Sequence, residues 1–217
     1  MLRILLTRHG TTDYTQEGRI QGTLDVPLSE GDIRQAENLR DHLKDATIHV
    51  AYSSPLVRAL QTTRIVCAYR DIPIIPDPRL KERDFGRFNG VRYEEVDTQG
   101  ASIDHYLFYK KDPNDDSNPS IPKRPEARGE TIEEVMAKMT EFYDMLKGKY
   151  QNITVLVMGH SRSNAYLLNS IWGIPHNRLA NFTQHITCMN EITIYPPMPN
   201  GERHIDVQVI NFRGHVI

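Results

Sequence analysis

The chain has 217 residues, 39% of them apolar, which is enough to bury the core of one domain. Its 26 basic and 28 acidic residues give a formal net charge of −2, so no broad basic field favours a nucleic-acid partner. Two cysteines are too few for a disulfide framework, and no apolar run approaches the roughly 20 residues of a membrane span, so we expect a cytoplasmic protein with no membrane partner.

The first half of the chain alternates strand-like and helix-like segments. Continuous apolar runs predict strands, whereas apolar residues at every third or fourth position predict amphipathic helices. Ser54 suits the N-cap of a helix, and Pro55 suits its first turn. The predicted elements are a buried strand at residues 2–7, a helix at 29–45 with Ile33, Ala36, Leu39 and Leu43 on one side, a strand at 49–53, a helix at 55–69 and a short strand at 72–75.

The second half continues this alternation after a polar interruption. Residues 112–130 contain four prolines and almost nothing apolar, which is typical of a long loop or a lid. Thr131 and Glu134 have the spacing of a capping box, so a helix begins at Ile132. Later elements are a central buried strand at 154–158, a helix at 163–172 and strands near 186–195 and 204–211. We expect one domain over residues 1–217, with a loop or lid insertion at about 112–130.

This order of elements predicts an α/β fold of three α/β/α layers, with helices on both faces of a mostly parallel central sheet. The ligand crevice of such folds lies beyond the carboxyl ends of the strands. His9 and His160 each follow a predicted strand, Arg58 lies one helical turn past another, and Glu82 follows the 72–75 strand. We therefore expect these side chains to converge at one edge of the sheet.

Phosphoryl transfer is one chemistry that this set of residues fits. A neutral imidazole at His9 can attack phosphorus while Arg8 and Arg58 bind the phosphoryl oxygens. The same cations keep the His9 imidazole unprotonated. Glu82 is the candidate acid that protonates the leaving oxygen.

Two other chemistries compete with phosphoryl transfer. His9 and His160 could be metal ligands, although the nearby arginines repel a metal cation and no paired His or Cys supports them. Gly159-His160-Ser161 could instead be an elbow that presents a serine nucleophile between a strand and a helix. Asp206 and His215 would then have to complete the triad.

Several motifs, in order along the chain, resemble those of the histidine phosphatase superfamily, the phosphoglycerate-mutase-like proteins. The ordered set carries the resemblance, because a lone Arg-His-Gly is a weak signal. Its parts are Leu6-Thr7-Arg8-His9-Gly10, Gly18-Arg19-Ile20-Gln21-Gly22, Asp25-Val26-Pro27-Leu28-Ser29, the run from Ser53 to Thr62, the run from Leu80 to Gly86 with Asn89-Gly90, Gly129-Glu130-Thr131 and Val157-Met158-Gly159-His160.

The resemblance implies a phosphoglycerate-mutase-like fold and a role for each matching residue. His9 would be the phosphorylated nucleophile, and Glu82 the proton donor. Arg8, Arg58 and His160 would form the phosphate pocket, with no metal and no cofactor. The further substrate-binding candidates are Thr15, Gln21, Arg83 and Ser161, of which Gln21 and Arg83 fit ordinary loop packing equally well.

Departures from the family pattern leave the substrate open. Many relatives have glutamate and asparagine at the positions of Thr11 and Thr15, and glycine or asparagine at that of Ser161. We expect an enzyme of the histidine acid phosphatase type that hydrolyses a small phosphorylated metabolite through a phosphohistidine. The alternatives are a phosphoglycerate-type mutase, which needs more structure over its site than this chain offers, and a low-turnover phosphate-binding or regulatory module. The sequence is compatible with a homodimer.

Overall fold

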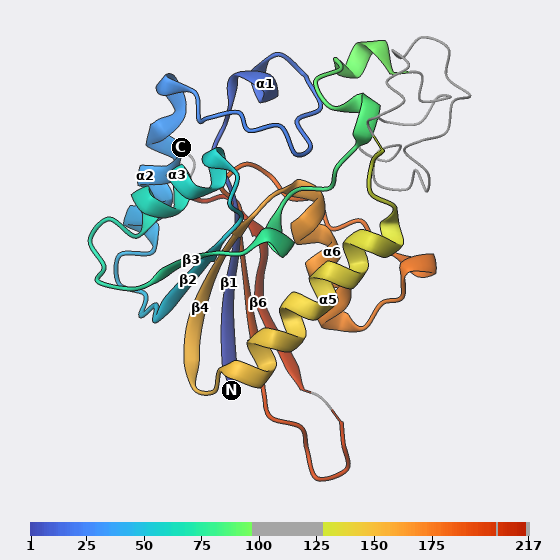
Figure 1. Cartoon of the computed structure of the whole chain (residues 1–217). Helices are drawn as coiled ribbons and strands as arrows, with labels where there is room; N and C mark the ends of the chain where they lie inside the picture. The colour runs from blue at the N-terminus through green and yellow to red at the C-terminus, as the bar shows by residue number, and fades with distance from the viewer. Residues whose placement is uncertain (97–127, 203, 216–217) are drawn as a thin grey trace.

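A computed structural model of the chain describes residues 1–96, 128–202 and 204–215 (Figure 1). Its centre is a six-stranded sheet with the strand order β3-β2-β4-β1-β5-β6. The strands are β1 (Leu2–Arg8), β2 (Val50–Ser53), β3 (Ile74–Pro76), β4 (Ile153–Gly159), β5 (Met189–Ile194) and β6 (Ile205–Phe212).

Strand direction is uniform except at β5. β1, β4, β2 and β3 pair in parallel, whereas β5 is antiparallel to both of its neighbours, β1 and β6. β6 therefore runs in the same direction as β1. The prediction of a mostly parallel sheet is confirmed, with one reversed strand that makes the sheet mixed.

Helices cover both faces of this sheet. α2 and α3 lie on one face, and α5 and α6 lie on the other (Figure 1). The α-helices are α1 (Asp13–Gln16), α2 (Ile33–His42), α3 (Val57–Val66), α5 (Ile132–Lys149) and α6 (Ser161–Trp172). Short 3-10 helices occur at Glu30–Asp32, Pro78–Leu80, Gly86–Phe88, Tyr93–Glu95 and His176–Arg178. None of the helices in the described ranges is long and apolar enough to cross a membrane.

The alternation of side chains along β1 explains the layers. Ile4 and Leu6 point into the core under α5 and α6, which includes Phe142. Leu5 points the other way, into the core under α2 and α3. Because each face of the central strands is apolar, each face needs its own layer of helices. The predicted three-layer α/β/α architecture is thereby confirmed.

One helix start follows the local sequence signals and two do not. At α5, Thr131 and Glu134 form the predicted capping box, with both reciprocal hydrogen bonds present. α3 begins at Val57, not at Pro55, because Leu56 is still extended. The amide of Val57 donates to Asp25 Oδ1 at 2.6 Å, so a residue far along the sequence caps this helix. α6 begins at Ser161, two residues earlier than predicted.

Other element boundaries also differ from the sequence-based prediction. α2 is shorter than residues 29–45, because a 3-10 turn precedes it and the chain leaves helical geometry after His42. Ile33, predicted on its apolar side, is 41% exposed at the first turn, whereas Ala36, Leu39 and Leu43 are buried. β5 begins at Met189, later than predicted, because Thr187 has a positive φ of 49° that interrupts the strand. The predicted insertion at 112–130 lies outside the described residues up to residue 127.

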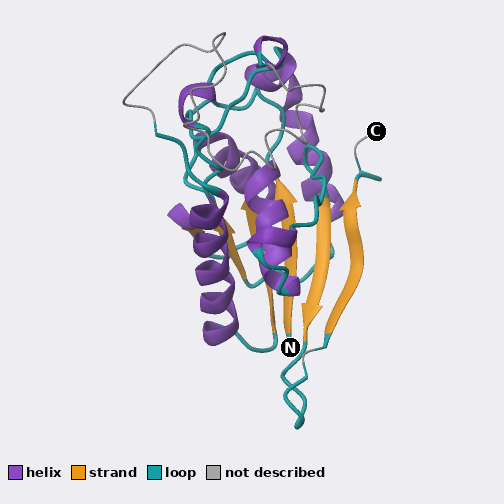
Figure 2. Cartoon of the chain, turned by 90° about the vertical axis from the view of Figure 1, so that its right-hand side faces the viewer, coloured by secondary structure: helices purple, strands orange, loops and turns teal. Residues whose placement is uncertain are grey.

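The register of the central strands sets the position of the functional residues. Arg8 pairs with Gly159 and Ser53 pairs with Met158, so β1, β2 and β4 end together. His9 and His160 therefore follow neighbouring strands at one edge of the sheet. The N-terminus lies at the opposite end of the strands (Figure 2).

Candidate active site

His9 is held with one ring nitrogen available to the site. Its side chain is 2% exposed, and Nδ1 lies 2.6 Å from the carbonyl oxygen of Gly10. Because a carbonyl can only accept, the proton of the neutral ring sits on Nδ1, and Nε2 carries a lone pair. Arg58 Nε donates to this Nε2 at 3.3 Å, which agrees with that tautomer.

Arg58 bridges His9 and the loop that precedes α2. It is 1% exposed and donates from Nη1 to the carbonyl of Leu24 at 2.7 Å and from Nη2 to that of Gly22 at 2.8 Å. Burial lowers the pKa of Arg58 to about 10, which still leaves the guanidinium charged at neutral pH. α3 supplies the rigid base from which this side chain reaches the site.

His160 lies behind His9, at the N-cap of α6. The two imidazole centroids are 4.9 Å apart and their planes are inclined by 57°. Both ring nitrogens of His160 are buried and have no hydrogen-bond partner among the described residues. Burial lowers the pKa of both imidazoles well below the ordinary value, and the charges of Arg58 and Arg8 lower each pKa further. Both rings are therefore neutral at pH 7 when no anion is bound.

Arg8 approaches the site from the end of β1. Its Nη1 donates to the carbonyl of Gln184 at 2.7 Å, whereas its buried Nε has no hydrogen-bond partner among the described residues. A buried amide pair supports this arrangement, because the side chains of Gln184 and Asn190 bond to each other in both directions. Burial lowers the pKa of Arg8, while the nearby carboxylate of Glu82 opposes that shift.

Glu82 follows the 3-10 helix Pro78–Leu80 and faces the site beside the N-terminus of α6. Its Oε1 accepts from the amides of Arg83 at 2.9 Å and Ser163 at 3.0 Å, and its Oε2 accepts from the amide of Arg162 at 3.1 Å. Oε2 retains capacity for another hydrogen bond, because a carboxylate oxygen has two lone pairs. The helix terminus thus fixes a carboxyl group beside the two histidines.

One cavity of about 290 Å³ joins most of these residues. Arg8, His9, Arg58 and Glu82 line it, and so do Thr15, Gln21 and Ser161 from the set of predicted substrate contacts. Arg83 does not line it. Its Nε donates to the Glu130 carbonyl at 3.0 Å, and its Nη1 lies 3.5 Å from the Tyr166 hydroxyl.

Thr15 and Gln21 form one unit on the cavity wall. Gln21 Nε2 donates to Thr15 Oγ1 at 2.8 Å, and the latter lies 3.1 Å from Thr12 Oγ1. Gln21 Oε1 is buried and has no partner in the described part of the chain. The threonine therefore orients the amide of Gln21 toward the site.

Sequence reasoning missed several residues of this cavity. They are Ile20, Gly22, Phe85, Tyr93, Arg162, His185, Ile186 and Arg213. Arg162 stands two residues after His160, so the strand-end pattern could have included it. Arg213 follows β6 and carries no motif, so it could be found only by knowing that β6 runs parallel to β1.

The two competing chemistries find little support in this geometry. In the described ranges, no three His, Cys, Asp or Glu side chains gather closely enough to hold a metal. Asp206 pairs with Thr193, which in turn pairs with Arg3 near the start of β1. It thus lies at the far end of the sheet from Ser161 and cannot complete a triad there.

Comparison with known proteins decides the family. The profile described as "Histidine phosphatase superfamily (branch 1)" matches residues 4–206. The chain belongs to the histidine phosphatase superfamily. The resemblance seen in its motifs is thereby confirmed.

Individual members of the superfamily match over most of the chain. The "Uncharacterized phosphatase PhoE" of Bacillus subtilis is 30% identical over 185 residues, which cover 83% of this chain and 85% of the relative. The "Probable phosphoglycerate mutase GpmB" of Proteus mirabilis is 29% identical over 177 residues, which cover 81% of this chain and 77% of that relative. The solved structure of YhfR from Bacillus stearothermophilus has a TM-score of 0.76 at 26% identity and covers 99% of both chains.

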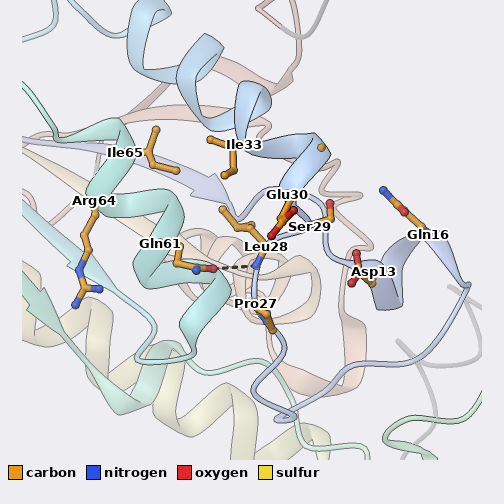
Figure 3. A pocket seen from close by; sticks show the side chains of 11 residues that line it. Asp13, Gln16, Pro27, Leu28, Ser29, Glu30, Ile33, Gln61, Arg64 and Ile65 are labelled. Atoms are coloured by element: carbon orange, nitrogen blue, oxygen red, sulfur yellow. Dashed lines mark hydrogen bonds between the residues drawn. The ribbon is translucent and has the colours of Figure 1, made fainter.

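This member of the histidine phosphatase superfamily has a second, larger cavity, which lies apart from His9 and His160. It measures about 930 Å³ and is lined by residues of α1, of the loop before α2, of the start of α2 and of α3 (Figure 3). The amide of Leu28 donates to Gln61 Oε1 across it at 2.8 Å. Figure 3 shows the guanidinium of Arg64 pointing away from the other labelled side chains. The larger cavity shares no lining residue with the cavity of about 290 Å³.

Proposed function

We propose that this protein is a phosphatase that hydrolyses a small phosphomonoester through a phosphohistidine at Nε2 of His9. The observation that carries the proposal is the tautomer of His9. Its Nδ1 is bound to the Gly10 carbonyl, so the lone pair of Nε2 is directed to the side where Arg58 lies. A neutral imidazole with a fixed lone pair is the form that attacks phosphorus.

The charges around His9 support binding of a phosphoryl group. Arg8 and Arg58 offer N–H donors in fixed orientations, as phosphate recognition requires. His160 has two ring nitrogens with no partner among the described residues. A bound phosphate dianion favours protonation of His160, which then donates a further hydrogen bond to a phosphoryl oxygen.

In the first step, Nε2 of His9 forms a bond to phosphorus while the bond from phosphorus to the ester oxygen breaks. Glu82 in its protonated form gives its proton to the leaving oxygen, so an alcohol departs. Arg8 and Arg58 stabilise the charge on the equatorial phosphoryl oxygens. In the second step, Glu82 takes a proton from water, whose oxygen forms a bond to phosphorus while the bond from phosphorus to Nε2 of His9 breaks. Inorganic phosphate leaves, and His9 is regenerated.

The test follows hydrolysis of p-nitrophenyl phosphate together with trapping of the intermediate. We expect His9→Ala to lower kcat/KM by at least about 10³-fold. Wild-type enzyme mixed with labelled phosphoester and quenched in alkali should retain label that acid then releases. The matched control is His176→Ala, a 3-10 helix residue outside the cavity, which should keep both activity and label.

The same assay tests whether Glu82 donates the proton to the leaving group. p-Nitrophenolate can leave as an anion without being protonated, whereas an alkyl alkoxide is a poor leaving group that must be protonated as it leaves. Glu82→Gln should therefore slow an alkyl phosphate far more than p-nitrophenyl phosphate. Equal losses on both substrates would assign Glu82 to structure and not to proton transfer.

The mutase alternative is supported by the Proteus relative, which is named as a probable phosphoglycerate mutase. Both reactions begin with phosphorylation of His9 and differ in the acceptor. Incubation with 3-phosphoglycerate distinguishes them, because a phosphatase releases inorganic phosphate whereas a mutase yields the isomer. Tight binding of phosphate or vanadate without turnover of any ester would favour the binding module instead.

A further inference from the structure

The larger cavity lies outside the proposed route of phosphoryl transfer, and part of its wall is apolar. The apolar side chains among its lining residues are Pro27, Leu28, Ile33 and Ile65. Figure 3 shows Ile33 and Ile65 facing each other above Leu28. The volume of about 930 Å³ is near the upper end of the range of small-molecule sites. A ligand with an apolar part fits this wall, because contact with it removes apolar surface from water.

Ile33 contributes an uncovered apolar side chain to this wall. It begins α2 and is 41% exposed, whereas Ala36 and Leu39 of the same helix are buried. A single exposed isoleucine is ordinary on a protein surface. One that lines a cavity together with three other apolar side chains indicates a surface that a ligand can cover.

Two unpaired carboxylates line the same cavity. Asp13 belongs to α1, and Glu30 begins the 3-10 helix before α2. Both residues are exposed, and neither side chain forms a hydrogen bond or an ion pair within the described ranges. In Figure 3 the carboxylate of Glu30 lies beside Leu28, and Asp13 stands on the side of α1. A cationic group can therefore approach both carboxylates without displacing a partner from them.

The neighbouring charges make this part of the cavity more negative. The carboxylate of Asp32 accepts from Gln16 Nε2 and from Ser29 Oγ, each at 2.7 Å. Gln35 Nε2 donates to the same carboxylate at 3.1 Å. These three donors are neutral, so they hold Asp32 without cancelling its charge. Arg64 also lines the cavity, but Figure 3 shows its guanidinium pointing away from the other labelled side chains. The local field therefore favours a cationic ligand.

Leu28 and Ser29 connect the cavity to the segment that follows His9. A Cβ built on Gly10 would lie 3.2 Å from Leu28 Cδ2, so the leucine packs closely against that glycine. The amide and the hydroxyl of Ser29 donate to the Thr11 carbonyl at 3.1 and 3.4 Å. A ligand that contacts Leu28 and Ser29 therefore acts on the two residues directly after His9.

α3 provides a second connection, because it carries one wall of the cavity and also Arg58. Gln61 lines the cavity and accepts from the Leu28 amide at 2.8 Å. Thr62, the next residue, accepts from the Gly10 amide at 3.1 Å and donates to the Arg58 carbonyl at 2.8 Å. A shift of Leu28 or of α3 therefore moves residues that hold the catalytic cavity in shape.

We propose that the larger cavity is an effector site for a small organic cation. The apolar body of this ligand lies against Leu28, Ile33 and Ile65, and its ammonium or guanidinium group lies near Asp13 and Glu30. Its binding alters turnover in the catalytic cavity through the contacts of Leu28 and of α3. The binding site is independent of the proposed phosphatase function, whereas the effect on turnover rests on it.

Three probes that share one apolar body test the binding site. They are 4-phenylbutylamine, with an ammonium group, 4-phenylbutan-1-ol, which is neutral, and 4-phenylbutyrate, which is anionic. In NMR titrations of the full chain at low salt, isoleucine methyl signals report where each probe binds. We expect the amine to shift Ile33 and Ile65 most, and to shift Ile20 and Ile186 of the catalytic cavity less. It should bind roughly three- to ten-fold more tightly than the alcohol, and the anionic probe should bind least tightly.

Substitution of the two carboxylates should remove the preference for the amine. In the double variant Asp13→Asn, Glu30→Gln, the Kd values of the amine and of the alcohol should agree within about two-fold. Ile33→Ser should weaken binding of both probes, because it removes apolar contact area. All three residues are exposed, so these variants put folding at little risk. Asp45→Asn, which changes an exposed carboxylate outside the cavity, is the matched control and should alter neither affinity.

Turnover of p-nitrophenyl phosphate tests the effector role. Saturating 4-phenylbutylamine should change the kcat/KM of the wild type by roughly five-fold or more, which is the usual scale of coupling between two sites. The double variant should not respond at the same concentration of the amine. Asp45→Asn should respond as the wild type does.

The binding site, the effector role and the phosphatase function fail in different ways. If the amine shifts Ile20 and Ile186 most, or binds no better than the alcohol, the proposed site is overturned. If it binds at Ile33 and Ile65 but leaves kcat/KM unchanged, the effector role is overturned. If the wild type hydrolyses no phosphoester, the proposed phosphatase function is overturned, and the titrations alone decide the binding site.

Discussion

Nε of Arg58 lies 3.3 Å from Nε2 of His9, while the two terminal nitrogens of the same guanidinium are bound to the carbonyls of Leu24 and Gly22. One side chain thus ties His9 to the loop that precedes α2. In the proposed mechanism these donors are in place before substrate arrives, so little reorganisation is needed when charge develops on the phosphoryl group.

Arg58→Lys tests this preorganisation. Lysine keeps the positive charge but cannot reach His9 and two carbonyls at once, because it lacks the planar fork. We expect kcat/KM for p-nitrophenyl phosphate to fall by about 10²- to 10³-fold. Arg64→Lys, an exposed residue on the same helix, should be neutral. Near wild-type activity in Arg58→Lys would mean that charge alone is sufficient.

The two buried histidines should make stability depend on pH. The pKa of His9 and that of His160 lie well below the ordinary 6.5 in the folded protein. Between the folded and unfolded pKa values the unfolded chain binds more protons, so the free energy of unfolding falls as pH drops below about 6.5. Each histidine contributes up to about 1.4 kcal/mol per pH unit inside that window.

Urea denaturation between pH 7.5 and pH 5, in a buffer free of phosphate, measures this slope. His160→Asn should flatten it, because one of the two buried imidazoles is gone. Inorganic phosphate should flatten it as well, since a bound dianion favours the protonated ring. An equal slope in the wild type and in His160→Asn would show that the buried imidazole of His160 does not contribute to this pH dependence.

The sequence predicts those parts of the site that local patterns encode. His9 and His160 stand directly after apolar strands, and the shared direction of parallel strands places both at one edge. The capping box at Thr131 is likewise a short-range motif that the structure confirms. In each case the sequence signal itself lies within a few consecutive residues.

Contacts between distant segments could not be predicted in the same way. Val57 is capped by Asp25, 32 positions earlier, and Glu82 is held by amides of α6 some 80 positions later. Arg213 reaches the cavity because β5 reverses and β6 returns. Such contacts depend on strand order and direction, which no local spacing reveals.

Gly22→Ala should weaken both the fold and the site. Gly22 has a φ of +50°, and a Cβ there would lie 1.9 Å from Asn89 Oδ1. Its carbonyl anchors Arg58 at 2.8 Å, so displacement of this loop moves the guanidinium. We expect unfolding to become easier by roughly 1–3 kcal/mol and kcat/KM to fall. Gly31→Ala is the control, since nothing lies within 4 Å of its added Cβ. Unfolding by urea and turnover of p-nitrophenyl phosphate check both effects.

Asn190→Leu tests whether the buried amide pair positions Arg8. Asn190 donates to the Leu6 carbonyl at 3.0 Å and to Gln184 Oε1 at 2.7 Å, and the Gln184 carbonyl receives Arg8 Nη1. Leucine keeps the branched shape but removes the donor that these buried acceptors share, so the free energy of unfolding should fall by about 2–4 kcal/mol. A released Arg8 binds phosphate less well, so KM for p-nitrophenyl phosphate should rise more than kcat falls, and inhibition by inorganic phosphate should weaken. Thr193→Val, toward the other end of the same strand, should leave KM unchanged. If Asn190→Leu lowers stability alone, with KM and phosphate inhibition intact, the amide pair supports the fold and does not position Arg8.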